Sequence, residues 1–278
     1  MIVIRNNTGL GSIVRNLVSA LRLGHYRNDQ VVLQNSNKSI EFILSYDQLG
    51  TMCLPGVEDY TTWRLQDPES TGGELLDPDN IVMIVDSVST VPAQGIDFQY
   101  ANIRQEVRNK WLTYFDLIHW NPDIIEVAND LYQQYQLEGA VGLHIRSWHD
   151  DAFRKNALHN TQMFVNAVLE TNAERVFLCC DSIEIENDLE NLLGSRVKLI
   201  KQNFQGERHI AIDQSVETMV HALLDLFLLS KCSTIIGTYQ SSFSELAWWI
   251  GRCQNKVTIP VPEYARILNE EYKCKKEH

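Results

Sequence analysis

The sequence predicts an α/β protein in which helices cover parallel β-sheets, and three observations indicate this class. Apolar strand-like runs alternate with amphipathic helical patterns along most of the 278 residues. The runs at 139–145 (GAVGLHI) and 175–180 (RVFLCC) are continuously apolar, as in parallel strands buried on both faces. Polar loops follow the strand-like runs. The length corresponds to two domains of roughly 100–200 residues each, and we place their boundary between residues 137 and 138.

The N-terminal half, residues 1–137, begins with a strand followed by a polar, glycine-containing loop, NNTGLGS. Ile13, Leu17 and Ala20 then recur at intervals of three and four residues, which predicts a helix. The segment 61–80 is rich in Pro, Gly, Asp, Glu and Thr and is predicted to be a long surface loop. The expected elements of this half are strands 2–5, 30–34 and 81–85 and helices 100–119 and 123–135.

The C-terminal half, residues 138–278, alternates more regularly between strands and helices. Asp213 or Ser215 caps a long helix that ends at Ser230, with Glu217 in its first turn. The expected strands are 139–145, 175–180, 197–200, 234–237 and 256–259. The expected helices are 160–171, 183–193, the capped helix to 230, 241–250 and a tail helix after Pro262.

Composition and charge exclude several classes of function. There are 24 Lys and Arg against 36 Asp and Glu, which gives a net charge of −12. An acidic surface repels phosphate backbones and excludes a non-specific nucleic-acid binder, although a local basic pocket for one small anion remains compatible. The sequence has neither a secretory signal nor an apolar run of about 20 residues. The six cysteines have no metal-ligand spacing, so we expect reduced thiols, a cytoplasmic location and no metal site.

Two of the polar loops suggest anion binding. Gly9 and Gly11 let the backbone approach a ligand before the N-terminus of a helix, but they do not form a dinucleotide or P-loop motif. His144 and Arg146 alternate at the end of a strand, where an arginine can contact two phosphate oxygens. The alternatives are a plain strand-to-helix turn at the glycines and a structural arginine paired with a carboxylate.

Two further features lie later in the chain. Asp225 shares an apolar helix face, one turn after His221, and its carboxylate would accept the N1–H and N2–H₂ donors of guanine. The alternative is a structural aspartate paired with a local arginine or backbone N–H. In GTYQSSF, Ser241 and Ser242 begin a helix and suit phosphate oxygens, although serines are common caps without any ligand.

Together these residues resemble the superfamily of fucosyltransferases that use GDP-fucose. The similarity rests on three segments: Gly9-Leu10-Gly11-Ser12, His144-Ile145-Arg146-Ser147, and Asp225 followed by Ser241-Ser242-Phe243. The stretch FLCCDS, which ends at Asp181 and Ser182, is also similar. The resemblance covers the second half of the chain well and the first half through its opening loop.

The resemblance implies a GT-B fold, with two Rossmann-like domains facing a cleft, and an inverting, metal-independent glycosyltransferase without a cofactor. Residues 1–137 would form the acceptor-side domain. Residues 138–278 would bind the GDP-sugar, and the C-terminal tail would pack back on the first domain. A glycan or saccharide would be the acceptor and L-fucose the expected sugar.

Carried over by position, Arg146 would be the catalytic residue that stabilises the β-phosphate as GDP leaves. The implied substrate-binding residues are Gly9, Gly11, His144, Asp181, Asp225, Ser241, Ser242 and Phe243, with Asp225 reading guanine. Candidates for a general base are His149, Asp150, Asp151 and Asp181; the alternative is that the acceptor hydroxyl loses its proton late, without a base. The alternative function is a nucleotide- or sugar-binding protein of the same fold that lacks transferase activity.

Overall fold

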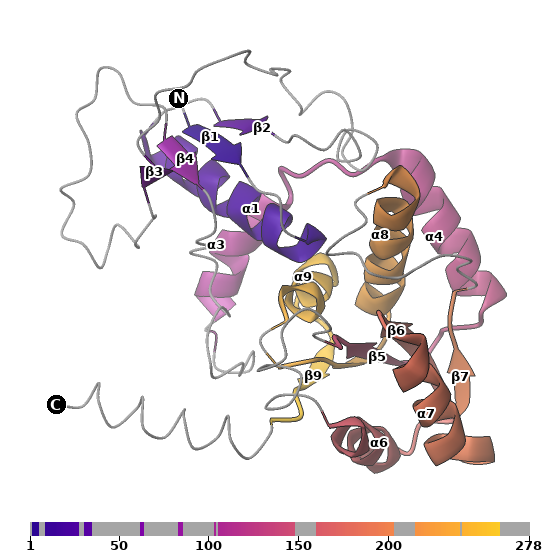
Figure 1. The fold of residues 1–278 in the computed structure, drawn as a ribbon. Coiled ribbons are helices and arrows are strands. Elements are labelled where there is room, and N and C mark those ends of the chain that lie inside the picture. Colours follow the sequence, from indigo (N-terminus) through magenta and orange to yellow (C-terminus); the bar gives the residue numbers. More distant parts are fainter. Residues whose placement is uncertain are drawn as a thin grey trace, which may run out of the picture. The chain divides into compact units, whose positions relative to one another are not determined.

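The computed structural model divides the chain into two compact units (Figure 1). Unit 1 comprises residues 1–94, 103–125 and 210–223, and unit 2 comprises residues 95–102, 126–209 and 224–278. The boundary at 137/138 remains a prediction. The residues that the structure describes are 2–5, 9–27, 31–34, 62–63, 83–85, 103, 105–147, 160–202, 215–239 and 241–261.

Unit 1 contains a parallel sheet of four strands in the order β2-β1-β4-β3. Its strands are β1 (Ile2–Arg5), β2 (Val31–Gln34), β3 (Thr62–Trp63) and β4 (Met83–Val85). Helix α1 (Leu10–Arg27) follows β1, and α3 (Gln105–Phe115) packs against α1, with the Arg22 guanidinium 5.1 Å from the Trp111 ring centroid. The prediction of a continuous loop over 61–80 is wrong at β3, because pairing with β4 forms a strand that no local pattern announces.

Unit 2 is built on a parallel sheet of five strands in the order β7-β6-β5-β8-β9. The strands are β5 (Val141–Ile145), β6 (Arg175–Cys180), β7 (Lys198–Ile200), β8 (Thr234–Ile236) and β9 (Lys256–Thr258). The other elements are α6 (Thr161–Glu170), α7 (Ile183–Leu193), the 3₁₀ helix η2 (Gly194–Arg196) and α9 (Ser242–Ile250). Helices α4 (Pro122–Gln134) and α8 (Val216–Ser230) each contribute residues to both units.

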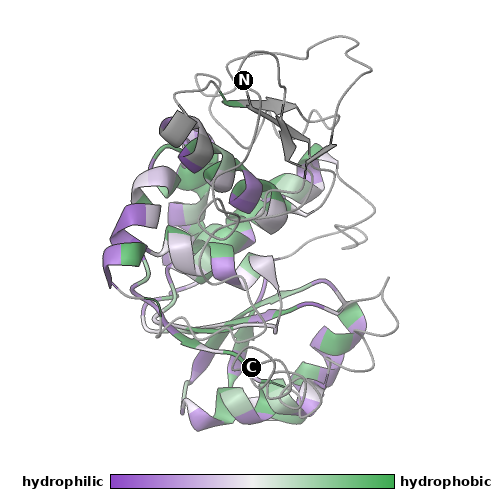
Figure 2. Cartoon of the chain, turned by 90° about the vertical axis from the view of Figure 1, so that its left-hand side faces the viewer, coloured by the Kyte–Doolittle hydropathy of each residue, from purple (hydrophilic) through white to green (hydrophobic). Residues whose placement is uncertain are grey.

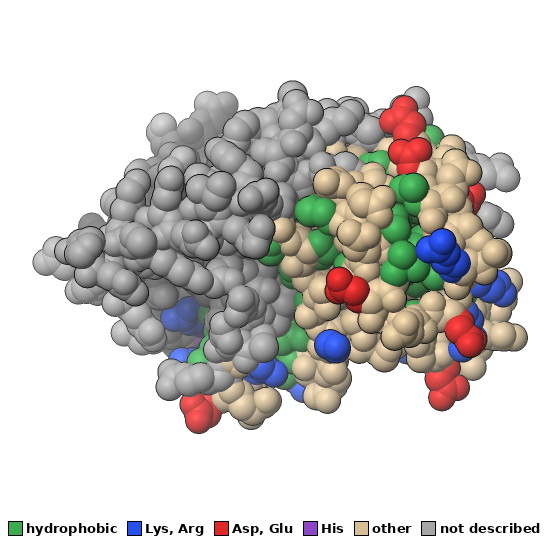
Figure 3. All heavy atoms as spheres, turned by 90° about the horizontal axis from the view of Figure 1, so that it is seen from below, with side chains coloured by type: hydrophobic (Ala, Val, Ile, Leu, Met, Phe, Trp, Pro, Cys, Tyr) green, Lys and Arg blue, Asp and Glu red, His purple; other side chains and the backbone are tan. Residues whose placement is uncertain are grey.

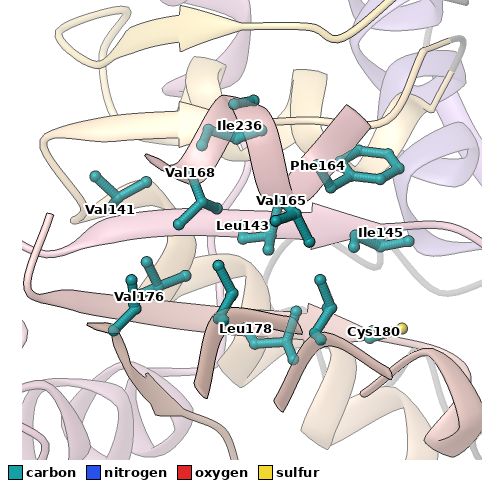
Figure 4. Packing of buried hydrophobic residues seen from close by; sticks show 14 residues of the cluster. Val141, Leu143, Ile145, Phe164, Val165, Val168, Val176, Leu178, Cys180 and Ile236 are labelled. Atoms are coloured by element: carbon teal, nitrogen blue, oxygen red, sulfur yellow. The ribbon is translucent and has the colours of Figure 1, made fainter. Parts of the chain in front are cut away.

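One face of this sheet packs on α6 and α7 to form a core of buried apolar side chains (Figure 4). Alternate residues of β5 and β6 point into it, because successive side chains of a strand lie on opposite faces. The residues labelled in Figure 4 are Val141, Leu143, Ile145, Phe164, Val165, Val168, Val176, Leu178, Cys180 and Ile236. Each fully buried aliphatic side chain stabilises the fold by about 1.5–3 kcal/mol before entropy is counted.

The opposite face is covered by the C-terminal part of α8 and by α9 (Figure 1). A Cβ atom at Gly142 of β5 would lie 2.4 Å from Leu229 Cδ1, so a larger residue there would require the Leu229 side chain of α8 to move. Hydrophobic residues recur along the strands, and the helices carry both hydrophobic and hydrophilic residues (Figure 2). Both faces of the sheet are therefore covered, which explains the continuous apolar runs in β5 and β6.

The strand order reverses between β5 and β8. From β5 the chain adds β6 and β7 on one side, and it then returns to add β8 and β9 on the other. In open α/β sheets, the carboxyl ends of two strands at such a reversal are where ligands bind. The residues that follow β5 and β8 stand at the position where open α/β sheets bind ligands.

The elements predicted in the second half are confirmed where the structure describes them. Strand 175–180 and helix 183–193 have the predicted bounds, and strand 139–145 begins two residues later than expected. The predicted tail helix after Pro262 lies outside the described residues.

Charged side chains of both signs are interspersed over the described part of the face seen in Figure 3. Within the described ranges, no helix is both long enough and apolar enough to cross a membrane. The four cysteines of the described segments, Cys179, Cys180, Cys232 and Cys253, are free thiols.

Candidate functional site

The residues after β5 are fixed by side chains from both neighbouring strands. On the β8 side, the backbone N–H of Arg146 donates to Thr238 Oγ1 at 2.9 Å, and this hydroxyl donates to the His144 carbonyl at 2.9 Å. On the β6 side, Asp181 accepts hydrogen bonds from the Arg146 guanidinium and from the backbone N–H of Ser147, the latter at 2.7 Å. Arg146 is therefore held in one place at the carboxyl edge of the sheet.

Asp181 has both of its carboxylate oxygens engaged by these bonds. Oδ2 forms the ion pair with Arg146 Nη1, and Oδ1 accepts from Ser147 N. The Asp181 side chain is buried, whereas the Arg146 side chain keeps 26% of its surface exposed. This geometry is that of a buried carboxylate that orients a partly exposed arginine.

His144 is buried against the beginning of α9. Its ring stacks on Phe243 with centroids 4.8 Å apart, and its Nδ1 lies 3.2 Å from Ser244 Oγ. Burial lowers the pKa of His144 to about 4, an effect that the nearby Asp181 carboxylate opposes and the Arg146 guanidinium reinforces. The imidazole is therefore neutral near pH 7 and offers one donor and one acceptor nitrogen.

Helix α9 begins directly beside the end of β8. Ser241 is its N-cap, with Oγ accepting from Phe243 N at 3.4 Å. A Cβ atom at Gly237 would lie 2.7 Å from Ser244 Oγ, so the missing side chain lets the helix approach the strand. The positive end of the α9 dipole is thus within the same strand-end site as Arg146.

Asp225 of α8 lies close to this site. Its Oδ1 accepts from Gln202 Nε2 at 2.5 Å, and its backbone carbonyl lies 3.8 Å from Cys179 Sγ. Cys179 is the partner of His144 in the β5–β6 register, which places Asp225 one strand away from His144. Desolvation and the Asp225 charge raise the pKa of Tyr135, which places that phenol near the carboxylate. The Gln202 amide is one contact of Asp225, and both the guanine-reading and the structural interpretations of this aspartate stay predictions.

Gly9 and Gly11 lie at the other predicted loop, in unit 1. Gly9 is exposed and precedes α1, and its carbonyl accepts from the backbone N–H groups of Ser12 and Ile13 at 3.0 and 3.2 Å. Gly11 is buried within the first turn. A Cβ atom at Gly9 would meet nothing within 4 Å. Gly9 therefore stands directly before α1, and the ligand-binding role of Gly9 and Gly11 stays a prediction.

The structure brings six of the predicted residues to one edge of the unit 2 sheet, and Asp225 adjoins them. These six are His144, Arg146, Asp181, Ser241, Ser242 and Phe243. Sequence reasoning missed Thr238, Ser244 and Gln202, which contact them. The only sign of them in the sequence is their position, because each follows a strand end or a helix cap by two or three residues.

Two further observations concern the chemistry of the site. The buried Ser147 hydroxyl has no hydrogen-bond partner within the described part of the chain. The described residues contain no group of three or more His, Cys, Asp or Glu side chains that could hold a metal ion. The proposed base candidates His149, Asp150 and Asp151 lie outside the described residues.

Among known proteins, only solved structures match this chain, and they inform on its fold. No protein-family model and no curated protein matches the chain. The fucosyltransferase NodZ from Bradyrhizobium superposes with a TM-score of 0.60 at 17% identity, covering 94% of this chain and 96% of NodZ. A variant of FUT1 from Arabidopsis thaliana in complex with GDP gives 0.62 at 12% identity, covering 95% and 71%. POFUT1 in complex with GDP-fucose gives 0.58 at 11% identity, covering 93% and 97%.

These superpositions cover most of the chain, and they include FUT1 with GDP and POFUT1 with GDP-fucose. The parallel sheets and the coverage agree with the sequence-based expectation of the fold. The chain therefore has the GT-B fold of the GDP-fucose-dependent fucosyltransferases.

Proposed function

We propose that this protein is an inverting glycosyltransferase that transfers L-fucose from GDP-fucose to a saccharide acceptor. The observation that carries the proposal is the position of Arg146: a partly exposed guanidinium, fixed from two strands, at the strand-order reversal of a GT-B fold. Two of the structural neighbours were solved with GDP or GDP-fucose. The donor would lie at this edge of unit 2, within the predicted domain 138–278, and domain 1–137 would receive the acceptor.

The chemistry requires positive charge where the diphosphate leaves. As the bond between the sugar C1 and the β-phosphate oxygen breaks, negative charge grows on GDP and positive charge on the sugar ring. The Arg146 guanidinium can donate to the β-phosphate oxygens, and the N-terminus of α9 adds a favourable dipole. With these two groups the protein itself would stabilise the leaving GDP. We therefore propose that the reaction needs no metal ion.

Inversion follows from a single displacement in which an acceptor hydroxyl attacks C1 from the face opposite GDP. Asp181 is a poor candidate for the base that takes the hydroxyl proton, because its two oxygens already accept from Arg146 and Ser147. We assign Asp181 to positioning Arg146 instead. The role of base then falls to another group, and His149, Asp150 and Asp151 remain proposed.

Asp225 is the proposed reader of guanine. Its carboxylate offers oxygen acceptors that match the adjacent N1–H and N2–H₂ donors of that base, which adenine and uracil do not present as a pair. The Gln202 amide, 2.5 Å from Oδ1, already shows that this carboxylate accepts an N–H donor from the direction of β7. His144 and Phe243 would flank the nucleoside, and the buried Ser147 hydroxyl would find its partner on the ligand.

The proposal is tested by calorimetry with GDP, UDP and ADP in the presence of EDTA. We expect GDP alone to bind. Arg146→Ala should lower release of fucose from GDP-fucose by roughly 100-fold, because removal of one transition-state charge partner has effects of that size. Arg175→Ala is the matched control, since Arg175 lies at the opposite edge of the same sheet and donates to Gln136 and Glu138 carbonyls. Absence of GDP binding, or equal losses in the two variants, would overturn the proposal.

A further inference from the structure

Thr238 links two strands at the point where their regular pairing has ended. Strand β8 ends at Ile236 and pairs with β5 only as far as Leu143. Two residues further on, the Thr238 hydroxyl accepts from Arg146 N and donates to the His144 carbonyl, both at 2.9 Å. One side chain thus replaces the backbone contacts that a longer β8 would have made.

The burial of Thr238 makes its hydrogen bonds important for the local structure. Thr238 is 2% exposed and its bond to the His144 carbonyl is buried, so no water could readily replace the hydroxyl at that carbonyl. The Thr238 carbonyl also accepts from Ser241 N at 3.1 Å, which joins this turn to the cap of α9. A single residue therefore connects β5, β8 and the start of α9.

We propose that Thr238 is a positioning residue that sets the place of Arg146 for binding the β-phosphate. This inference rests on the proposed function. Thr238 fixes the backbone of Arg146 from the β8 side, while Asp181 fixes its guanidinium from the β6 side. An arginine whose backbone and guanidinium are both held loses little conformational entropy when it binds an anion. This preorganisation strengthens the bond to the anion.

A purely structural role for the hydroxyl makes a different prediction. A bond that only joins two strands would affect the stability of the sheet and all ligands alike. A bond that positions Arg146 would affect ligands that carry a β-phosphate and would leave others unchanged. GDP and GMP provide this comparison, because they share base, ribose and α-phosphate and differ in the β-phosphate.

The experiment compares Thr238→Val with Thr238→Ser, which keeps the hydroxyl. Ser233→Ala is the matched control, because Ser233 Oγ also donates to a β5-side carbonyl, that of Ala140 at 3.3 Å, at the opposite edge of the sheet. We expect Thr238→Val to weaken GDP binding by roughly tenfold, the size of a lost charge-assisted bond, and to leave GMP binding unchanged. Thr238→Ser and Ser233→Ala should bind both nucleotides as the wild type does.

A second measurement tests the contact without any nucleotide. Hydrogen exchange at the Arg146 amide should be faster in Thr238→Val than in the wild type and unchanged in Thr238→Ser and Ser233→Ala. If the valine variant does not fold, Thr238→Cys, with its weaker hydrogen-bonding thiol, should show the same two effects at reduced size.

The outcomes separate this inference from the function on which it rests. If the wild type binds no GDP, the proposed function fails, and the exchange rates alone decide whether Thr238 holds Arg146. If GDP binds and Thr238→Val weakens GDP and GMP equally, the hydroxyl has a structural role only and the inference is wrong. Unchanged exchange at Arg146 in the valine and cysteine variants would also overturn it.

Discussion

The buried imidazole of His144 predicts a specific loss of stability in mild acid. Burial lowers its pKa from 6.5 to about 4 in the folded protein, whereas the unfolded chain keeps a value near 6.5. As the pH falls below 6.5, the unfolded state therefore binds more protons at this residue than the folded state. The contribution to stability is complete above pH 6.5 and decreases progressively down to about pH 4.

The size of the effect follows from the two pKa values. Between pH 7.5 and pH 5, a histidine that titrates near 6.5 when unfolded and about 4 when folded changes the free energy of unfolding by about 2 kcal/mol. Other groups titrate in the same interval, so the total change in wild-type stability is not informative. The difference between the wild type and a variant without the imidazole isolates the contribution of His144.

The variant of choice is His144→Asn, because an asparagine amide can replace Nδ1 beside Ser244 Oγ and does not titrate. Urea unfolding of both proteins, followed by tryptophan fluorescence, is measured at pH 7.5 and pH 5. We expect the wild type to lose about 2 kcal/mol more than the variant. His119→Asn, at an exposed histidine, controls for removal of an imidazole in general.

Two results would refute this reasoning. Equal losses in wild type and variant would mean that the imidazole of His144 is not desolvated in the folded protein. A smaller loss in the wild type would mean that the Asp181 carboxylate dominates and that His144 becomes a cation in the folded state. The second result would also remove a neutral His144 from the proposed nucleoside contact.

Three further predictions concern the same edge of the sheet. Gly237→Ala should destabilise the protein by about 1–3 kcal/mol, measured by urea unfolding, because its Cβ would lie 2.7 Å from Ser244 Oγ; an unchanged midpoint would show that α9 can shift. Asp181→Asn should lower release of fucose from GDP-fucose by about tenfold or more through misplacement of Arg146, and unchanged turnover would contradict its positioning role. Asp225→Asn should abolish the preference for GDP over ADP in calorimetry, and a retained preference would place guanine recognition elsewhere.

The sheet of unit 2 could be predicted from the sequence because its signal is local. Strands β5 and β6 are buried on both faces, so their apolar character is continuous and ends sharply at polar residues. Strand β3 could not be predicted in this way. Its two residues become a strand only by pairing with β4, a contact between distant segments for which a single sequence carries no pattern.

The candidate site shows the same division. Arg146, Asp181 and Ser241 are visible in the sequence because each follows a strand-like run. Their partners are not visible, because the contact of Thr238 with Arg146 depends on β8 lying beside β5 rather than beside β7. Sequence reasoning could therefore identify the residues at the edge but could not predict which of them lie next to each other.

The hydrogen bonds at this edge explain why an arginine stands at the end of β5. In many α/β proteins the anion at such a position is bound by backbone N–H groups of a glycine-rich turn. Here the N–H groups of Arg146 and Ser147 donate to Thr238 and Asp181. Because those two donors are used within the protein, the diphosphate of the proposed donor would be met at the end of β5 by the guanidinium of Arg146, which supplies charge as well as donors.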